Sequence, residues 1–193
     1  MYRAPGHRAP VCYDSRVTRP RTLTHLADTV TALLDAETDA AAFELALDAT
    51  LRASTADMGA IFRPSGQSLR LTLHRNLPQA FRKRPPLLDT QRWGAETFVR
   101  TPQGGPTGAP LQEMAALTGI QTWATAPVRP RQTVHGLILL GSRDLVGFSD
   151  DAIAYLKIVA HVLGLALESA SSAIRSGPPP VPTTVGPFPL ADD

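Results

Sequence analysis

Residues that could do covalent or metal chemistry are few in this 193-residue chain, and they are not grouped. The single cysteine, Cys12, has no second cysteine, which excludes an intramolecular disulfide and a cysteine-rich zinc site. The five histidines are scattered without the spacing of metal ligands. The carboxylates Asp150 and Asp151 open an apolar helical pattern, so we interpret them as helix-start charges and not as an acid–base pair. The sequence therefore predicts no catalytic residues and no metal site.

Motifs for phosphate binding and nucleophilic catalysis are also missing. The glycine-rich run at 104–110 reads GGPTGAP, without the Gly-Lys-Ser/Thr ending that places a lysine on phosphate. No Gly-x-Ser-x-Gly pattern precedes a helix. We therefore expect a protein that is not an enzyme.

The best candidate for a binding site is a group of large aromatic side chains in and beside the proline- and glycine-rich segment 76–119. If this segment folds over a sheet, the aromatic rings would line an apolar cavity with basic side chains at its rim. The alternative is that the rings fill the core beneath the loops and leave no pocket. The candidate ligand-binding residues are His74, Arg75, Trp93, Phe98 and Trp123.

Charge and proline are concentrated at the two ends of the chain. Residues 1–21 carry a net charge of +4, residues 177–193 carry −2, and the middle of the chain sums to zero, which accounts for the net +2. Nine of the 18 prolines lie in these two end segments. We therefore predict a flexible basic tail at 1–21, one domain at 22–176 and a proline-rich disordered tail at 177–193.

This distribution also limits the partners and the location. Because the positive charge belongs to the first tail and not to a folded surface, we do not expect nucleic-acid binding. No apolar run reaches the roughly 18 to 20 residues that span a bilayer, and the N-terminus lacks the apolar core of a secretory signal. We expect no membrane partner and a cytoplasmic protein.

Hydrophobic periodicity predicts the elements that would position the candidate site. Apolar residues at helical spacing predict one helix from 22 to about 36 and a second over AAAFELALDATLRA. The run 58–77 predicts a hairpin with its turn at PSGQ. Its second strand would point Leu69, Leu71 and Leu73 inward and His74 outward. A short helix at 111–117, ended by Gly119, would precede two adjacent strands in 120–143.

The last helix, capped by Ser149, is apolar over most of its circumference. A helix on a single sheet needs an apolar arc only a little over about 100° wide, and this arc is roughly twice that. It should therefore be buried on two sides, either by the first helix of the same chain or by the helices of a second chain. We favour a homodimer, with the interface residues Leu26, Val30, Leu33, Leu156, Val159, Leu163 and Leu167.

The order of these elements resembles that of a GAF domain over about residues 22–172. The matching features include a strand ending in Ala126–Pro127–Val128, a strand containing His135–Gly136–Leu137–Ile138, and the run Phe148–Ser149–Asp150–Asp151 before a long apolar helix. Two helices followed by GAIFRPSG match the first half. The resemblance implies an α+β fold, an α/β sandwich with a central antiparallel sheet of about six strands, helices on one face and ligand-binding loops on the other.

The resemblance also implies a sensory or regulatory role. GAF domains are mostly modules that bind small molecules or chromophores, and they often dimerise through their first and last helices. The last helix commonly signals to a kinase, cyclase or transcription domain. Because the proline-rich tail follows that helix here, we expect the signal to reach a separate partner protein. The alternative function is a ligand-free dimerisation or interaction scaffold with a filled pocket.

No cofactor of the family is indicated. Cys12 lies upstream of the domain without a preceding PAS domain, so we expect neither bilin attachment nor methionine sulfoxide reduction, which needs cysteines inside the domain. The N-K-F-D-E type motif of cyclic-nucleotide binders is missing. A haem would need an axial histidine such as His74 or His135, which we expect to be ordinary surface or hydrogen-bonded residues. The cofactor and the ligand remain unassigned.

Overall fold

The computed structural model describes residues 19–83, 85–93, 98–100, 113, 115–145 and 147–175. The two predicted tails lie outside these residues, except that the first helix already begins at Arg19. The helices are α1 (Arg19–Leu34), α2 (Asp39–Arg52), α3 (Gln79–Lys83), α4 (Thr90–Trp93) and α6 (Asp150–Arg175). The strands are β1 (Met58–Ser65), β2 (Ser68–Arg75), β3 (Leu88–Asp89), β4 (Phe98–Arg100), β5 (Thr122–Val128) and β6 (Gly136–Ser142).

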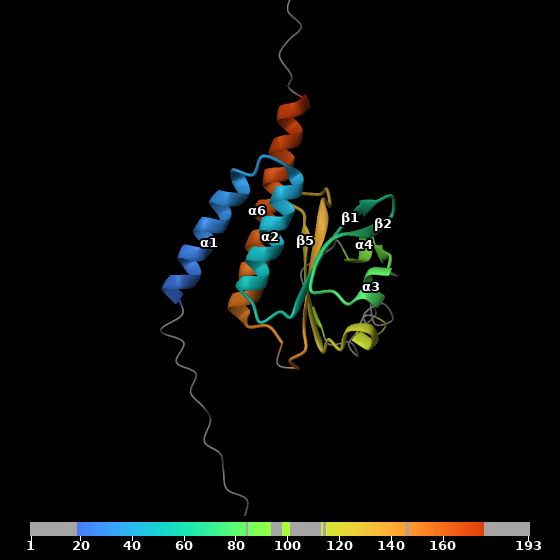
Figure 1. Ribbon diagram of the computed structural model, residues 1–193. Helices are drawn as coiled ribbons and strands as arrows, with labels where there is room; N and C mark the ends of the chain where they lie inside the picture. Colours follow the sequence, from blue (N-terminus) through green and yellow to red (C-terminus); the bar gives the residue numbers. More distant parts are fainter. Residues whose placement is uncertain are drawn as a thin grey trace, which may run out of the picture.

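The strands form a six-stranded sheet in the order β3-β2-β1-β6-β5-β4, and every neighbouring pair is antiparallel. The long helices α1, α2 and α6 lie on one side of the sheet, and the short helices α3 and α4 lie on the other (Figure 1). We call the side of α3 and α4 the front face and the other side the helical face. The predicted α+β architecture with about six strands is confirmed.

The helical face has two layers. Helices α2 and α6 contact strands of the sheet, and α1 contacts both α2 and α6. Figure 1 shows α1 as the outermost helix, farthest from the sheet. The apolar circumference of α6 is therefore covered by its own sheet and by two helices of its own chain, and not by the sheet alone.

Local signals in the sequence explain where several elements begin and end. The hydroxyl of Thr38 accepts a hydrogen bond from the Ala41 amide at 3.2 Å, which caps α2. The predicted cap of α6 is confirmed, because Ser149 Oγ accepts a hydrogen bond from the Ala152 amide at 3.2 Å. Gly119 follows the short helix described at 115–118 and has a φ of 72°, a left-handed conformation that suits glycine at a helix end.

The sheet separates two hydrophobic clusters. The helical cluster fills the space between the sheet and the long helices, and the front cluster covers the opposite face. The helical cluster comprises Leu33, Ala42, Phe43, Ala46, Leu47, Ala49, Ile61, Ala124, Ala126, Val128, Ile138, Leu140, Tyr155, Leu156, Val159, Ala160, Leu163 and Leu167. The front cluster comprises Met58, Ala60, Phe62, Leu69, Leu77, Phe81, Leu88, Trp93, Ile120, Trp123, Leu137 and Leu139. Because both faces are covered, β5 and β6 are buried along almost their whole length.

Helix α6 also has the length and composition of a membrane span. Within the described residues it is the one helix that meets this test, over Asp150–Ser171. The core helix of a globular domain passes the same test, and here the helix packs against β5, α1 and α2.

Candidate functional site

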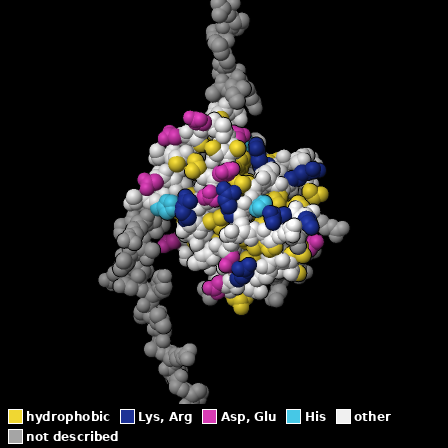
Figure 2. All heavy atoms as spheres, in the orientation of Figure 1, with side chains coloured by type: hydrophobic (Ala, Val, Ile, Leu, Met, Phe, Trp, Pro, Cys, Tyr) yellow, Lys and Arg dark blue, Asp and Glu magenta, His cyan; other side chains and the backbone are white. Residues whose placement is uncertain are grey.

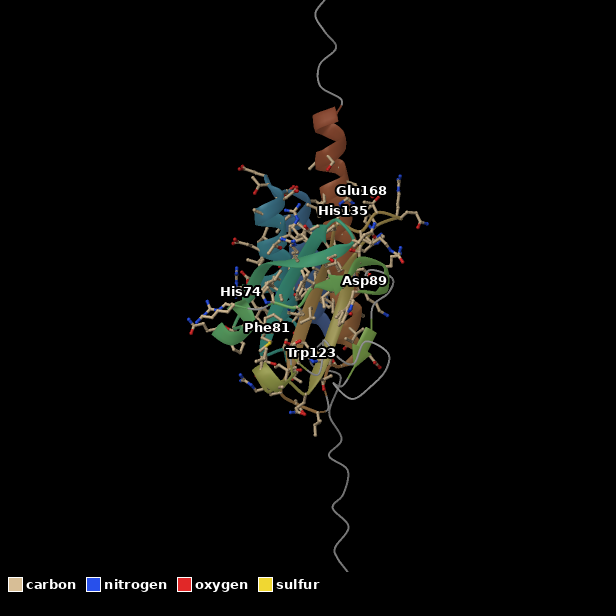
Figure 3. All side chains as sticks on the ribbon, turned by 90° about the vertical axis from the view of Figure 1, so that its right-hand side faces the viewer. His74, Phe81, Asp89, Trp123, His135 and Glu168 are labelled. Atoms are coloured by element: carbon tan, nitrogen blue, oxygen red, sulfur yellow. The ribbon has the colours of Figure 1, made fainter. Side chains whose placement is uncertain are left out.

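Two of the predicted ligand-binding residues, Trp93 and Trp123, lie in the front cluster and are almost fully buried. Trp123 comes from β5 in the middle of the front face, and Trp93 ends the short helix α4. Figure 3 looks onto this face and shows Trp123 and Phe81 there. The two indoles are therefore packed beneath the front elements, as the alternative of a filled core expected.

The position of Trp123 depends on a glycine in the next strand. Gly141 of β6 pairs with Trp123 in the register of the sheet. A Cβ atom at Gly141 would lie 2.9 Å from the indole Cζ3, which is closer than such atoms approach, and 3.1 Å from Met58 Cγ, a tight contact. Glycine at this position lets the indole lie against the backbone of β6.

The front face carries polar atoms without partners. Trp123 Nε1, Thr125 Oγ1 and Thr90 Oγ1 are buried, and none has a hydrogen-bond partner among the residues that the structure describes. Trp123 and Thr125 lie two residues apart on β5 and so share a face of the strand. Thr90 opens α4 on the same side of the sheet, but it directly follows edge strand β3, four strands away from β5. Buried polar atoms in proteins are nearly always hydrogen-bonded, so this group needs an explanation.

A β-bulge in the β1–β2 hairpin places the side chain of His74 on the front face of the sheet and that of Arg75 on the helical face. The β1–β2 register shifts between Ile61 and Phe62, whose partners are Leu73 and Leu71, so that Thr72 is the extra residue. Its hydroxyl donates to the Ile61 carbonyl at 3.2 Å. The expectation that alternation continues through Leu73 and places His74 outward is wrong, because the bulge reverses the side-chain direction after Thr72.

As a result, Leu73 packs against the helical cluster and His74 faces the front. His74 pairs with Ala60, Ala60 pairs with Leu139, and Leu139 pairs with Thr125, so these residues form one row across the front face. His74 lies at the β2 end of this row (Figure 3). Burial lowers the pKa of His74, and the positive charges of Arg82 and Arg75 lower it further.

Arg75 points to the helical face, where it joins the hairpin to α2. Its Nε lies 2.8 Å from Asp48 Oδ1 and its second nitrogen 3.2 Å from Asp48 Oδ2, a two-point contact. Glu44 Oε2 lies 3.8 Å from the same guanidinium. The hydrogen bond to Asp48 raises the pKa of Arg75. Arg75 is therefore not at the rim of the front face, and of the two basic candidates only His74 is.

Phe98 belongs to the short edge strand β4, where its backbone pairs with Thr125. Its side chain lies outside the described residues. The backbone of Phe98 therefore continues the row of paired residues that contains Thr125 onto β4.

The predicted dimer residues are mostly core residues of a single chain. Leu33, Leu156, Val159, Leu163 and Leu167 are buried in the helical cluster, and Leu26 packs against it. Val30 is half-buried. The sequence leaves two ways to bury this apolar stripe, the first helix of the same chain or a second chain. In the structure these residues lie on the faces that α1 and α6 turn toward each other, α2 and the sheet. The exposed large apolar residues on these helices are instead Leu23 and Leu34 of α1 and Ile158 and Leu165 of α6.

Two buried hydroxyl groups of the helical layer are paired with each other. Thr29 Oγ1 lies 2.8 Å from Tyr155 Oη, and both residues are buried. The ring of His25 packs edge-on against Tyr155 at 5.9 Å between centroids. Near the other end of α6, His135 Nε2 lies 3.6 Å from Glu168 Oε1, and Figure 3 shows these two residues together. This distance is too long for a hydrogen bond, and the buried nitrogen has no hydrogen-bond partner among the described residues.

Described residues line cavities on the helical face. A groove of about 670 Å³ lies between the α1–α2 connection and the end of α6. A cavity of about 270 Å³ separates α1 from α2, and one of about 220 Å³ lies between α2 and the β1–β2 hairpin. Within the part of the chain that the structure describes, no group of His, Cys, Asp and Glu could hold a metal ion.

Sequence reasoning missed Thr90 and Thr125 as candidate site residues. Both look like ordinary strand or loop threonines, and only their burial without a partner distinguishes them. The alternating pattern of 122–128 could have indicated that Thr125 shares a face with Trp123.

No protein-family model matches the chain, and no curated protein matches it. Several solved structures match it in fold. The chromophore-binding domain of the bacteriophytochrome RpBphP3 from R. palustris aligns with a TM-score of 0.63 at 14% identity, covering 84% of this chain and 64% of that one. This chain thus spans less than two thirds of the bacteriophytochrome domain.

Two GAF domains match over most of their own length. The one from a Coxiella burnetii phosphoenolpyruvate-protein phosphotransferase aligns with a TM-score of 0.62 at 14% identity, covering 80% of this chain and 96% of that one. The one from a proposed sensor histidine kinase of Pseudomonas syringae aligns with a TM-score of 0.62 at 15% identity, covering 82% and 92%. At these identities, the likeness establishes the fold.

Proposed function

The chain has the fold of a GAF domain, and from that premise we propose that it is a non-enzymatic sensory or regulatory module. It binds a small molecule on the front face and signals through a dimeric bundle of α1 and α6 to a separate partner protein in the cytoplasm. The similar structures include domains of a bacteriophytochrome and of a proposed sensor kinase, which supports the sensory reading.

The observation that carries this proposal is the group of unpaired polar atoms on the front face. Leaving a buried donor or acceptor unpaired costs about 1 to 3 kcal/mol. Thr90, Trp123 and Thr125 together would therefore cost several kcal/mol in the protein alone, a large part of a typical domain's stability. A ligand with its own polar atoms, bound over β5, would supply partners for Trp123 and Thr125.

The unpaired atoms on the front face indicate which hydrogen-bonding groups the ligand would need. The indole Nε1 can only donate, so the ligand needs an acceptor opposite Trp123, while the two threonine hydroxyls can donate or accept. The front cluster itself is apolar and aromatic, which suits an uncharged planar molecule. His74 lies at the edge of this surface with its pKa lowered, so it is neutral at pH 7 and adds no buried charge.

Native mass spectrometry of the protein purified from its source tests ligand binding. We expect the wild type to retain a small molecule and Trp123→Phe, which keeps a large ring but removes the donor, to lose most of it. Leu145→Ala, at an exposed loop position, is the matched control and should retain it. A bare wild-type protein would contradict ligand binding.

The dimer proposal now rests on the outer residues of the helical layer. Leu23, Leu34, Ile158 and Leu165 are large apolar side chains left exposed on the two helices that contact each other. Burying them against a second copy would remove this surface from water. Sedimentation velocity should show a dimer that Ile158→Glu together with Leu165→Glu converts to a monomer, while Leu145→Glu leaves it intact. A monomeric wild type would contradict this part of the proposal.

A second function, the ligand-free interaction scaffold, is supported by a different observation. Trp93 and Trp123 are fully buried together with Phe62 and Phe81, so aromatic rings occupy the front face themselves. In that case the dimer would form and the mass spectrum would show no retained molecule. The two measurements together separate the two functions.

A further inference from the structure

The cavity between α1 and α2 lies in the helical layer, on the opposite side of the sheet from the front face. We call it the helix-joint cavity. It has a volume of about 270 Å³ and is lined by His25, Asp28, Thr29, Ala32, Leu45, Ala49 and Arg52. Figure 1 shows that α1 and α2, which supply all of these residues, lie next to each other. Nothing in the proposed front-face function uses this cavity.

Opposite charges flank the cavity, one from each helix. Asp28 comes from α1 and Arg52 from the last turn of α2. Within the described part of the chain, neither side chain takes part in an ion pair or a hydrogen bond. Figure 2 shows acidic and basic side chains on this side of the molecule. Both charges are therefore available to a molecule that enters the cavity.

The inner wall is polar and already ordered. Thr29 lines the cavity, and its hydroxyl is held by Tyr155 Oη at 2.8 Å and by the His25 carbonyl, to which it donates at 2.8 Å. Burial raises the pKa of Tyr155, while the hydrogen bond with Thr29 and the charge of Arg52 oppose that rise. Arg52 thus lies near enough to this wall for its charge to act on Tyr155.

The remaining lining is apolar and sets the size of a ligand. Ala32, Leu45 and Ala49 supply the apolar part of the lining, and Leu45, like Asp28 and Arg52, is exposed to solvent. The cavity has a volume of about 270 Å³ and opens to solvent, which suits a small molecule. A ligand that fits is small, carries both charges and has a short apolar part.

We propose that the helix-joint cavity binds a free α-amino acid with an aliphatic side chain. The planar guanidinium of Arg52 receives the carboxylate, in the two-point geometry that arginine offers to carboxylates. The carboxylate of Asp28 receives the ammonium group. The aliphatic side chain packs against Ala32, Leu45 and Ala49.

Such a ligand would join α1 to α2 through both of its charges. Because it binds the folded chain, it would also raise the stability of the fold by mass action. Helix α1 contacts α6 as well, so the amino acid would strengthen the attachment of the outer helix to the rest of the domain.

Thermal unfolding and isothermal titration of the full chain with L-leucine test this inference. Leucine has nine non-hydrogen atoms and both charges. We expect a saturable rise in the unfolding temperature and a heat of binding. Isocaproate, which lacks the ammonium group, and isoamylamine, which lacks the carboxylate, should each bind at least about tenfold more weakly. Equal binding of isocaproate and leucine would overturn the assignment of a zwitterion.

Substitutions locate the binding. Arg52→Gln and Asp28→Asn should each weaken leucine binding by about tenfold or more. The matched controls Arg131→Gln and Asp35→Asn change exposed charges that do not line the cavity, and they should bind like the wild type. If the Kd is about 1 mM or tighter, binding is nearly complete at about 10 mM leucine, so absence of binding there overturns the proposal. The proposal is also overturned if the control variants weaken leucine binding as much as the cavity variants do. Neither result affects ligand binding on the front face, which the mass spectrum measures separately.

Discussion

The two faces of the sheet differ in whether their buried hydroxyl groups have hydrogen-bond partners. On the helical face, Thr29 pairs with Tyr155, and the Thr50 hydroxyl donates to the carbonyls of Ala46 and Leu47 at 2.9 Å. On the front face, the Thr90 and Thr125 hydroxyls have no hydrogen-bond partner within the described part of the chain. These buried hydroxyls of the helical layer are therefore paired within the chain, while those of the front face have hydrogen-bonding capacity that the described residues do not use. That difference is what makes the front face the better candidate for binding.

The largest expected effect comes from removing the centre of the front cluster. Trp123 is 0% exposed, so Trp123→Ala should lower the free energy of unfolding by about 3 to 5 kcal/mol, through lost burial and the cavity left behind. Urea denaturation measures this. The control Leu145→Ala, at a side chain 71% exposed and outside the proposed dimer surface, should cost less than about 1 kcal/mol. Similar losses for both variants would mean that the front face is not packed around Trp123.

The second effect concerns a paired hydroxyl on the helical face. Thr29→Val keeps the shape of the side chain but leaves the buried Tyr155 hydroxyl without its partner at 2.8 Å. We expect a loss of about 1 to 3 kcal/mol in urea denaturation. Val replaces Thr within a helix at little change in helix propensity, so the loss reports the hydrogen bond. An unchanged stability would show that the hydroxyl pair contributes nothing.

The same substitution on the front face should have the opposite sign. Thr125→Val removes a buried hydroxyl that has no partner, and valine suits a strand at least as well as threonine. In ligand-free protein we expect stability to stay equal or rise by up to about 1 kcal/mol. Differential scanning calorimetry of both variants gives the comparison directly. A loss at Thr125 as large as that at Thr29 would remove the distinction between the two faces.

The smallest expected effect is a dependence of stability on pH that comes from His74, at the edge of the front face. The pKa of His74 is lowered from its ordinary value of 6.5 by burial and by the charges of Arg82 and Arg75. The unfolded chain therefore binds this proton at a higher pH than the folded chain does. Stability should fall as the pH drops through 6.5 toward the folded-state pKa, and should show no effect of His74 above that range.

Titration of the His74 ring by NMR measures the folded pKa. Arg82→Gln should shift it back toward 6.5, whereas Arg131→Gln, in the β5–β6 turn, should leave it unchanged. A His74 that titrates above 6.5 would contradict the placement of this ring beside Arg82 on the front face.

Local patterns predicted most of the elements. The spacing of apolar residues predicted α1, α2 and α6, and the alternation and turn chemistry predicted the β1–β2 hairpin and the β5–β6 pair. Caps at Ser149 and Gly119 were predicted for the same reason, since a cap needs only residues within one turn of the chain. The site was predicted less well. Trp93, Trp123 and His74 lie on or beside the front face, but Arg75 does not, and Thr90 and Thr125 were missed.

What the sequence determined by itself is the type and order of the elements and the excess apolar surface of the last helix. Only the tertiary structure decided what covers that surface, because a helical stripe looks the same whether its own chain or a second copy packs against it. The structure alone also revealed the bulge at Thr72, which turns His74 and Arg75 to opposite faces. An unpaired buried hydroxyl is likewise invisible in a sequence, because pairing depends on residues that are distant along the chain and adjacent only in the fold.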